Sequence, residues 1–434
     1  MFRNKFNIRD ISFKEEFYRF LSLRNKVSNE VTEIVQSIII DIETKGDEAL
    51  VNYTNELDKR KIETIRDCFV ESNRLDESLK KINEDERNAL ELAAKRIKNF
   101  HVNTCLDFTS GDLIPEASRV FRPLDRVGVY VPGGKANYPS TVLMAAIPAK
   151  VAGVEEVIMT LPAINGQLSD LTLAAARISK VDKVYSFGGA QAIAAMALGT
   201  ESVSRVDKIV GPGNKYVTEA KRQLYGRVGI DGIQGPSEIV IIADKFSNIG
   251  TIIWDLISQA EHDEMATSIL ISDDQRIIDK VEKEMSLLVK SQDRRNIILK
   301  SLESNSASFK VDSIDQAIEI SNEIAPEHLN LCVKEPRYFL KRVKNAGLIL
   351  LGEKSSIALS DYVLGPSHVL PTGGSSRFAS SLCVEDFMKF SNIIDCEKIY
   401  NTDDYESLLN ATELLAKKEG LVAHAISAKI RKNK

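Results

Sequence analysis

The stretch RVGVYVPGGKANYPSTVLMAAIPAKVAGVEEVIMTLP, residues 126–162, decides the fold. It begins with a short β-branched run, RVGVYV, continues with a longer Ala-rich apolar run, and ends with a second short run, EEVIMTLP. Short apolar runs of this kind are typical of buried strands, and a longer run between two of them is typical of a crossover helix. The stretch therefore predicts a strand–helix–strand unit of a parallel sheet.

The same alternation continues to about residue 225 and resumes at SEIVIIAD, residues 237–244. Four strand–helix units in succession predict a parallel sheet with helices on its faces, and the second series predicts a second α/β sheet. Residues 1 to about 105 and the tail after Leu382 are charged amphipathic runs, which predict helices. The 27 residues 355–381 show little periodicity, and a loop of that length inside a compact enzyme is typically functional.

Composition narrows the class of protein. A chain of 434 residues predicts two or more domains, and 62 acidic against 57 basic residues without a basic block argue against nucleic-acid binding. The first fifteen residues are charged, and no run approaches the roughly 18 apolar residues of a membrane span. Five scattered cysteines without a Cys-x-x-Cys pair argue against a disulfide framework and a thiolate zinc cluster. We therefore expect a cytoplasmic protein that does not contact membranes.

Three glycine-rich turns each follow a predicted strand: VPGGKANY (131–138), FGGAQA (187–192) and GPGNKY (211–216). The carboxyl ends of strands form the ligand crevice of an open α/β sheet, and backbone amides at helix starts suit phosphate, so the turns suggest a nucleotide. Tight turns need glycine in any case, and GPGNKY lacks the third glycine of the dinucleotide fingerprint. Both interpretations of the turns remain open.

The segment SQAEHD places Gln259 and His262 three residues apart at the end of a predicted helix, on the same stripe as Asp255. Side chains at that spacing can converge on one metal ion. The alternative is that His262 is a cation beside the last helix carbonyls, and glutamine is an uncommon zinc ligand. The helix alone does not decide between them.

The segment APEHLN presents Glu327 and His328 together at the mouth of a predicted strand, directly after Pro326. A base and a carboxylate side by side suit proton transfer. The alternative is a connector with two solvated polar residues. Asp361 and His368 in the long loop and His424 in the tail are unremarkable individually, and His101 is interpreted as structural.

Taken together, these segments resemble the histidinol dehydrogenase family. The resemblance runs from GDEAL at 46–50 to EGLVAH and is carried by long motifs: RVGVYVPGG, STVLMAA, FGGAQAIAA, GPGNKYV, GPSEIVIIAD, SQAEHD, APEHLNL, SDYVLGPSHVLPTGG and EGLVAH. One departure is the segment DGIQ before GPSE, which is expected to shift the fit of substrate at Ser237 slightly.

The resemblance implies residue roles. It implies one zinc ion per subunit held by Gln259, His262, Asp361 and His424, and catalysis by Glu327 and His328. It implies NAD contacts from Tyr130, Gln191 and Asn214. The implied substrate contacts are Ser237, Gln259, His262, His328, Asp361, Glu419 and His424.

The implied fold class is α/β, with two incomplete Rossmann-like parallel-sheet domains plus small helical N- and C-terminal elements. The expected division is an N-terminal segment 1–24, a larger α/β domain from 25–128 and 238–380, an inserted NAD-binding domain 129–237, and a C-terminal segment 381–434 that reaches the partner subunit. The resemblance thus also implies a homodimer with shared active sites.

The implied reaction is oxidation of L-histidinol through L-histidinaldehyde to L-histidine, the last steps of histidine biosynthesis, with two NAD reduced and one water consumed. A related zinc and NAD enzyme that oxidises another small alcohol, such as a sulfonated diol, is one alternative. A zinc hydrolase, with Glu327 activating a metal-bound water, is a second. A zinc-stabilised scaffold is a third, and it has no use for the Glu327–His328 pair.

Overall fold

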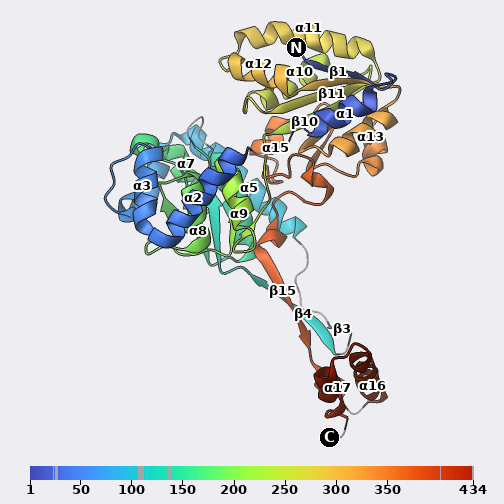
Figure 1. The fold of residues 1–434 in the computed structure, drawn as a ribbon. Coiled ribbons are helices and arrows are strands. Elements are labelled where there is room, and N and C mark those ends of the chain that lie inside the picture. The colour runs from blue at the N-terminus through green and yellow to red at the C-terminus, as the bar shows by residue number, and fades with distance from the viewer. Residues whose placement is uncertain are drawn as a thin grey trace. The chain divides into compact units, whose positions relative to one another are not determined.

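The computed structural model describes residues 1–22, 24, 28–105, 112–114, 116–133, 138–400 and 402–432. The chain divides into two compact units (Figure 1). Unit 1 comprises residues 1–105 and 124–387, and unit 2 comprises residues 106–123 and 388–434. No helix in the described ranges is long and apolar enough to cross a membrane.

The first sheet of unit 1 contains the predicted four strand–helix units. Its strands follow the order β2-β7-β6-β5-β8-β9, all parallel except β2, which is antiparallel to β7. The strands are β2 Phe69–Val70, β5 Arg126–Tyr130, β6 Glu156–Thr160, β7 Lys183–Tyr185, β8 Lys208–Val210 and β9 Gly229–Ile230. The crossover helices are α6 Pro139–Ala152, α7 Asp170–Ile178, α8 Gly189–Leu198 and α9 Lys215–Leu224.

Helices cover both faces of this sheet, as its continuous apolar strands require. One face packs against α6 and α7 together with α4 Ser72–Lys81 and α5 Glu84–Thr104. The other face packs against α8 and α9 together with α2 Asn29–Lys45 and α3 Asp47–Leu57 (Figure 1). Helix α6 is apolar all round and buried along most of its length, which is typical of a helix enclosed by other helices. The charged N-terminal helices thus supply the outer layer of the first core.

The second sheet of unit 1 is parallel throughout, in the order β1-β12-β11-β10-β13-β14. Its strands are β1 Asn4–Asn7, β10 Glu238–Ala243, β11 Thr267–Ser272, β12 Ala307–Lys310, β13 His328–Cys332 and β14 Leu348–Leu351. One face packs against α10 Ile249–Ala260, α11 Gln275–Leu288 and α12 Arg295–Ser304. The other packs against α1 Phe13–Ser22 and α13 Ile314–Ile324. The expected α/β class with two parallel-sheet layers is therefore confirmed.

Three segments differ from the helices that the sequence predicts, and one of them is the two-residue strand β2 of the first sheet. Residues Asn4–Asn7 form the edge strand β1, which pairs in parallel with β12 and places Phe6 on Phe309 at 4.6 Å between ring centroids. Residues Met388–Ile394 form β15 in unit 2, where it pairs antiparallel with β4 Ala117–Pro123, which in turn pairs with β3 Asp112–Ile114. Almost all of β15 is exposed, so it lacks the alternation of buried and exposed residues that would reveal a strand. The rest of the tail forms α16 Asp403–Lys418 and α17 Val422–Lys429, as predicted.

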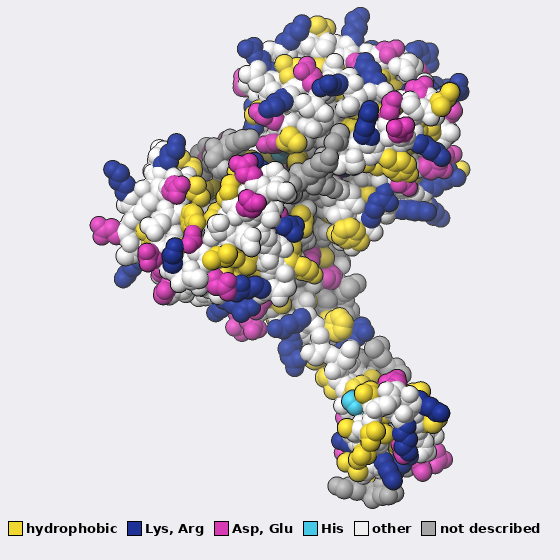
Figure 2. All heavy atoms as spheres, viewed as in Figure 1, with side chains coloured by type: hydrophobic (Ala, Val, Ile, Leu, Met, Phe, Trp, Pro, Cys, Tyr) yellow, Lys and Arg dark blue, Asp and Glu magenta, His cyan; other side chains and the backbone are white. Residues whose placement is uncertain are grey.

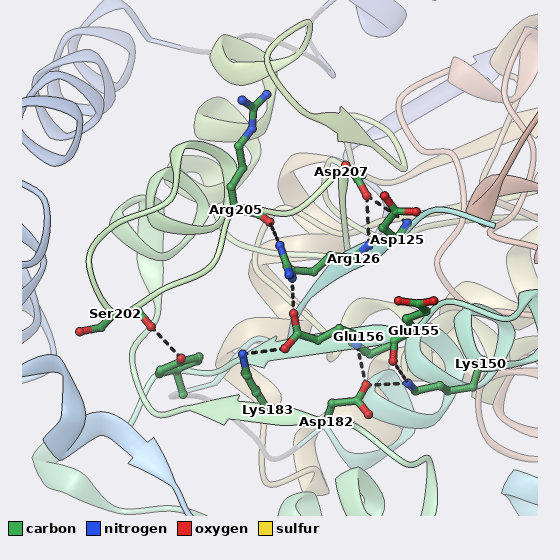
Figure 3. Close-up of polar contacts among 12 residues, drawn as sticks. Asp125, Arg126, Lys150, Glu155, Glu156, Asp182, Lys183, Ser202, Arg205 and Asp207 are labelled. Carbon is green, nitrogen blue, oxygen red and sulfur yellow. Dashed lines mark hydrogen bonds and ion pairs between the residues drawn. The ribbon is translucent and has the colours of Figure 1, made fainter. Parts of the chain in front are cut away.

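Charged side chains join the amino ends of the strands of the first sheet. The Glu156 carboxylate at the start of β6 binds Arg126 on β5 and Lys183 on β7, the latter at 2.6 Å (Figure 3). Arg126 also donates to the carbonyl of Arg205 at 2.9 Å. Asp182 binds Lys150 at 2.5 Å (Figure 3). These contacts fix the relative register of three neighbouring strands.

We expect Glu156→Gln to lower the free energy of unfolding at pH 7, because it removes two ion pairs. The loss should be only about 1 kcal/mol, since solvent at Arg126 and Lys183 screens both pairs. Partial burial acts to raise the pKa of Glu156, but Lys183 and Arg126 outweigh it and lower the pKa. The stabilisation is therefore present above the ordinary value of 4.5 and is lost as the pH falls through the lowered one. Urea unfolding at pH 7 and at lower pH measures both effects. The exposed neighbour offers a control, Glu155→Gln, and an equal loss in both variants would contradict the network.

Candidate active site

Glu327 and His328 lie where α13 ends and β13 begins. Ala325 adopts a left-handed conformation, with φ of 49°, and Pro326 follows, so the helix stops and the chain turns into the strand. His328 lies in register with Ile239 of β10 and Leu348 of β14. Both side chains are nearly enclosed, because Glu327 is 6% exposed and His328 is 3% exposed. The two residues therefore lie at the amino edge of the second sheet.

The backbone of Glu238 holds both side chains. Its N–H donates to Oε2 of Glu327 at 2.7 Å, and its carbonyl oxygen lies 3.0 Å from Nδ1 of His328. A carbonyl only accepts, so Nδ1 carries a proton and Nε2 is the nitrogen that exchanges one. Nε2 is buried, lies 3.7 Å from Oδ1 of Asp361, and has no hydrogen-bond partner among the described residues. The geometry leaves one basic ring atom free for chemistry.

Glu238 is itself held by a buried ion pair. Arg24 binds its carboxylate at 2.5 Å and donates to the carbonyl of Ile324 at 3.1 Å. The N–H of Gly373 donates to the second oxygen at 3.2 Å. The sequence analysis did not identify Glu238 as a site residue. A carboxylate inside the otherwise apolar run SEIVIIAD is nevertheless a detectable signal of a buried polar contact.

The two carboxylates set the protonation of the histidine. Burial acts to lower the pKa of His328, but the negative charges of Glu327 and Asp361 outweigh it and raise the pKa to about 10. Burial raises the pKa of Glu327, and the neighbouring His328 opposes that rise. Burial also acts to raise the pKa of Asp361, but His328, His368 and His262 outweigh it and lower the pKa. The three groups titrate together, and with these charges alone the ring holds a proton on both nitrogens at neutral pH.

Gln259 and His262 lie at the carboxyl end of α10, which brings them to the same edge of the second sheet. Gln259 is 1% exposed, and neither its side-chain oxygen nor its nitrogen has a hydrogen-bond partner in the described part of the chain. A buried amide without hydrogen-bond partners costs free energy in the folded state. The side-chain oxygen and nitrogen of Gln259 are therefore suited to contact a bound ligand or ion. His262 is exposed on one side, yet the surrounding protein removes enough water to lower its pKa, against the charge of Asp361. That shift favours the neutral imidazole that binds metals.

Asp361 lies in the segment that the sequence predicts as a long loop, where the structure has a short helix, α15 Ile357–Tyr362. Ser356 caps the helix by accepting from the N–H of Ala358. The carbonyl of Asp361 lies 2.9 Å from Nδ1 of His368, whose Nε2 lies 3.2 Å from the hydroxyl of Thr141. His368 thus orients the backbone that carries Asp361.

Asp255 and Asn330 form a second buried contact near these residues. The amide nitrogen of Asn330 donates to Asp255 at 3.1 Å and to the carbonyl of Ser355 at 3.4 Å. Burial raises the pKa of Asp255 to about 6. The contact joins α10, β13 and the segment leading to α15. Asn330 is a further polar residue in a buried strand that sequence reasoning missed.

The remaining predicted residues lie elsewhere. Ser237 is half-buried directly before β10, and its carbonyl accepts from the N–H of Thr267 at 2.9 Å. In the DGIQ segment that precedes it, Gln234 accepts from the buried Lys221 at 2.7 Å. Glu419 ends α16 and His424 lies on α17, and both are exposed residues of unit 2.

The structure does not show the expected four-residue zinc cluster. Within the described ranges, no group of three or more His, Cys, Asp or Glu side chains is placed to hold a metal ion. Of the four expected ligands, only His262 and Asp361 are His, Cys, Asp or Glu residues of unit 1. Gln259 is an amide, and His424 belongs to unit 2. The unpartnered amide of Gln259 is the observation that fits a metal.

Tyr130, Gln191 and Asn214 lie at the carboxyl edge of the first sheet. Tyr130 is the last residue of β5. Its hydroxyl accepts from the N–H of Gly189 at 3.1 Å, and burial raises the pKa of Tyr130 to about 12. Gln191, in the first turn of α8, is fully buried, and both of its side-chain polar atoms lack partners among the described residues. Asn214 caps α9 by accepting from the N–H groups of Tyr216 and Val217 at 3.0 and 3.2 Å. Gln191 is therefore the residue here with unused hydrogen-bonding capacity.

Close backbone packing explains one of the glycines in these turns. Gly211 has φ of 113°, and a Cβ there would lie 2.1 Å from the carbonyl oxygen of Tyr130. Only glycine fits that contact. Residues 134–137 of the VPGGKANY turn lie outside the described residues.

Comparisons with known proteins agree with one another. A family model described as histidinol dehydrogenase matches residues 22–432. The chain is 46% identical to histidinol dehydrogenase from Hydrogenovibrio crunogenus, over 98% of this chain and 99% of that protein. It is 45% identical to the one from Pseudomonas fluorescens, over 98% and 96%. The crystal structure of histidinol dehydrogenase from Elizabethkingia anophelis superposes with a TM-score of 0.90 at 30% identity, over 99% and 98% of the two chains.

Proposed function

Since the chain belongs to the histidinol dehydrogenase family and is an oxidoreductase, we propose that it oxidises L-histidinol to L-histidine through L-histidinaldehyde, with zinc and NAD. The reaction consumes one water and two NAD and transfers four electrons. The observation that carries the proposal is the buried His328, whose Nε2 is unpartnered and whose Nδ1 is fixed by the carbonyl of Glu238. This is the arrangement of a positioned general base.

His328 removes the proton from the alcohol of the substrate as the carbinol hydrogen leaves as hydride. The proton moves to Nε2, because the carbonyl of Glu238 keeps the other proton on Nδ1. The same nitrogen accepts a proton again in the second oxidation, after it has released the first one. His328 therefore has to keep one tautomer and one orientation through both oxidations. The carbonyl of Glu238 fixes the tautomer, and burial at the start of β13 restricts the motion of the ring.

Glu327 activates the water that adds to the aldehyde. Burial raises the pKa of its carboxyl, so the ionised form is a stronger base than an exposed carboxylate. The N–H of Glu238 holds Oε2 at 2.7 Å and fixes the orientation of the group. The aldehyde hydrate is then oxidised with His328 as the base, and no cysteine nucleophile is required.

Gln259, His262 and Asp361 would hold zinc together with His424 from a second copy of the chain. The buried, unpartnered amide of Gln259 and the neutral imidazole of His262 fit that role. When bound, zinc would hold the nitrogen donors of the substrate and, as a cation beside Asp361, oppose the field that raises the pKa of His328. Ser237 and Glu419 would complete the substrate contacts.

Tyr130, Gln191 and Asn214 would contact NAD at the carboxyl edge of the first sheet. The unpartnered amide of Gln191 supports a ligand there. When bound, NAD accepts the hydride that leaves the substrate carbon. Tyr130 stays a neutral phenol at neutral pH, so it can donate a hydrogen bond without repelling phosphate.

A homodimer would bring the tail of one copy to the active site of the other. Unit 2 supports this, because α16, α17 and the residue after α17 expose large apolar side chains that a folded monomer leaves uncovered: Leu414, Leu415, Val422, Ile426 and Ile430. Figure 2 shows hydrophobic side chains gathered on this unit.

A spectrophotometric assay tests the proposal by following NADH with histidinol and with a panel of other small alcohols. We expect histidinol to give the highest kcat/KM. A paralogous enzyme would prefer another alcohol, such as a sulfonated diol. A zinc hydrolase, in which Glu327 activates a metal-bound water, would not require NAD. That alternative does not explain the buried, unpartnered amide of Gln191.

A further inference from the structure

A cavity of about 740 Å³ opens at the carboxyl edge of the second sheet, where no residue of the proposed active site lies. The loops after β10, β11, β12 and β13 line it. Strand order reverses between β10 and β13, and open α/β sheets bind ligands at such a switch point. Strand β10 carries Glu238 at its other end, so the cavity lies roughly 17 Å from the catalytic pair along the strand.

Two ammonium groups lie against the ring of Phe246 at the switch point. Nζ of Lys245, after β10, and Nζ of Lys334, after β13, lie 5.1 and 5.0 Å from the ring centroid of Phe246. In the described part of the chain neither forms an ion pair with a carboxylate. Asp244 is occupied, because it accepts from the N–H groups of Phe246 and Lys334, both at 2.9 Å. The pair of lysines therefore offers two positive charges to an anion.

The other cations of the cavity already have partners. Arg276 binds Asp274 through two nitrogens, at 3.0 and 2.6 Å. Nζ of Lys310 donates to the carbonyl of Val311 at 2.6 Å. An anion in the cavity would therefore be attracted to Lys245 and Lys334 first.

Asp273 follows β11, the second strand of the β10–α10–β11 unit. In nucleotide-binding sheets a carboxylate at this position accepts hydrogen bonds from ribose hydroxyls. Burial raises the pKa of Asp273, and the negative charge of Asp244 adds to that rise. Hydroxyl donors would stabilise its ionised form.

An aromatic pair, Tyr338 and Phe339, also lines the cavity. Tyr338 is 71% exposed and packs edge-on against Phe339, with ring centroids 5.0 Å apart. An exposed aromatic face in a cavity suits stacking of a planar base.

The backbone N–H groups at the starts of α10 and α11 are already capped by side chains, which leaves them poorly suited to bind a pyrophosphate. Asn248 accepts from the N–H groups of Gly250 and Thr251 at the start of α10, and Asp274 caps α11. No glycine-rich loop follows β10, so backbone amides are not free to cradle two phosphates. The lysine pair suits a single phosphate group.

We propose that this cavity binds a nucleoside 5′-monophosphate, with the phosphate on Lys245 and Lys334, the ribose hydroxyls on Asp273 and the base on Tyr338. The proposal does not depend on the reaction proposed above. It concerns a separate site at the opposite edge of the second sheet.

Calorimetric titration of the full chain with AMP tests the proposal, with ribose 5-phosphate and inorganic phosphate as shorter probes. We expect Lys245→Ala and Lys334→Ala each to weaken AMP binding about ten- to a hundredfold, because each removes a charged contact to phosphate. The variants K245R and K334R should restore binding. Asp273→Asn should weaken AMP binding about tenfold and leave the binding of inorganic phosphate unchanged. The control Lys283→Ala, on the exposed face of α11, should bind as the unaltered protein does.

Gln191→Ala separates this cavity from the proposed NAD site, which an AMP moiety could also enter. AMP binding that survives Gln191→Ala and fails in both lysine variants supports the cavity. The reverse pattern overturns it. Inorganic phosphate that binds as tightly as AMP would also overturn the nucleotide proposal, as would no saturable AMP binding up to about 5 mM.

Discussion

We expect replacement of His328 by alanine to lower kcat for histidinol oxidation by roughly two to four orders of magnitude, while histidinol still binds. The variant removes the base whose Nε2 is buried and unpartnered, and water enters in its place without a fixed orientation. Steady-state kinetics and histidinol binding by calorimetry separate the loss of turnover from a loss of affinity. A variant with near-normal kcat would remove His328 from the mechanism.

Glu327→Gln provides the matched comparison, because it keeps the size of the side chain and the hydrogen bond from Glu238. With histidinol as the substrate, we expect His328→Ala to slow both oxidations. Glu327→Gln slows mainly the second half, which can be measured separately with histidinaldehyde. Equal effects of both variants on both halves would contradict the division of roles between the two residues.

If the proposed zinc site is correct, we expect a chelator to abolish histidinol binding, and we expect His262→Ala and His424→Ala each to leave the purified protein without zinc. The reason is that each variant removes a nitrogen ligand from a site that needs four. Elemental analysis gives the zinc content per subunit independently of activity. Glu261→Gln, next to His262 and exposed, is the control and should retain one zinc per subunit. Unchanged metal content in both histidine variants would count decisively against the site.

The sheets could be predicted from the sequence because their signals are local. Strands such as β6 and β10 are buried along their whole length, so they appear as continuous apolar runs between turn residues. The family's long motifs also identify Glu327, His328, Gln259 and His262 as candidate residues. Local pattern did not identify β1, a four-residue edge strand that pairs, within the described ranges, with β12 alone, 303 residues away from Asn4 to Ala307.

The sequence places His328 at the start of a strand and Gln259 at the end of a helix, but it does not predict that the two share one edge of the second sheet. The usual expectation places ligands at the carboxyl ends of strands, and Tyr130, Gln191 and Asn214 follow it. His328 begins β13 and Gln259 ends α10, so both lie at the amino edge instead. The contacts that fix Glu327 and His328 come from the backbone of Glu238, and any residue except proline could supply them, so residue type carries no signal for them. Non-local backbone contacts of this kind are visible only once the strands are paired.

The most direct measurement of the central claim is the number of NADH molecules formed per molecule of histidinol consumed. Complete conversion of a limiting amount of histidinol, followed by NADH absorbance and by quantification of histidine, should give two NADH and one histidine. One NADH per histidinol with the aldehyde as the product would contradict the four-electron account. Consumption of histidinol without any NADH would contradict the NAD-dependent account altogether.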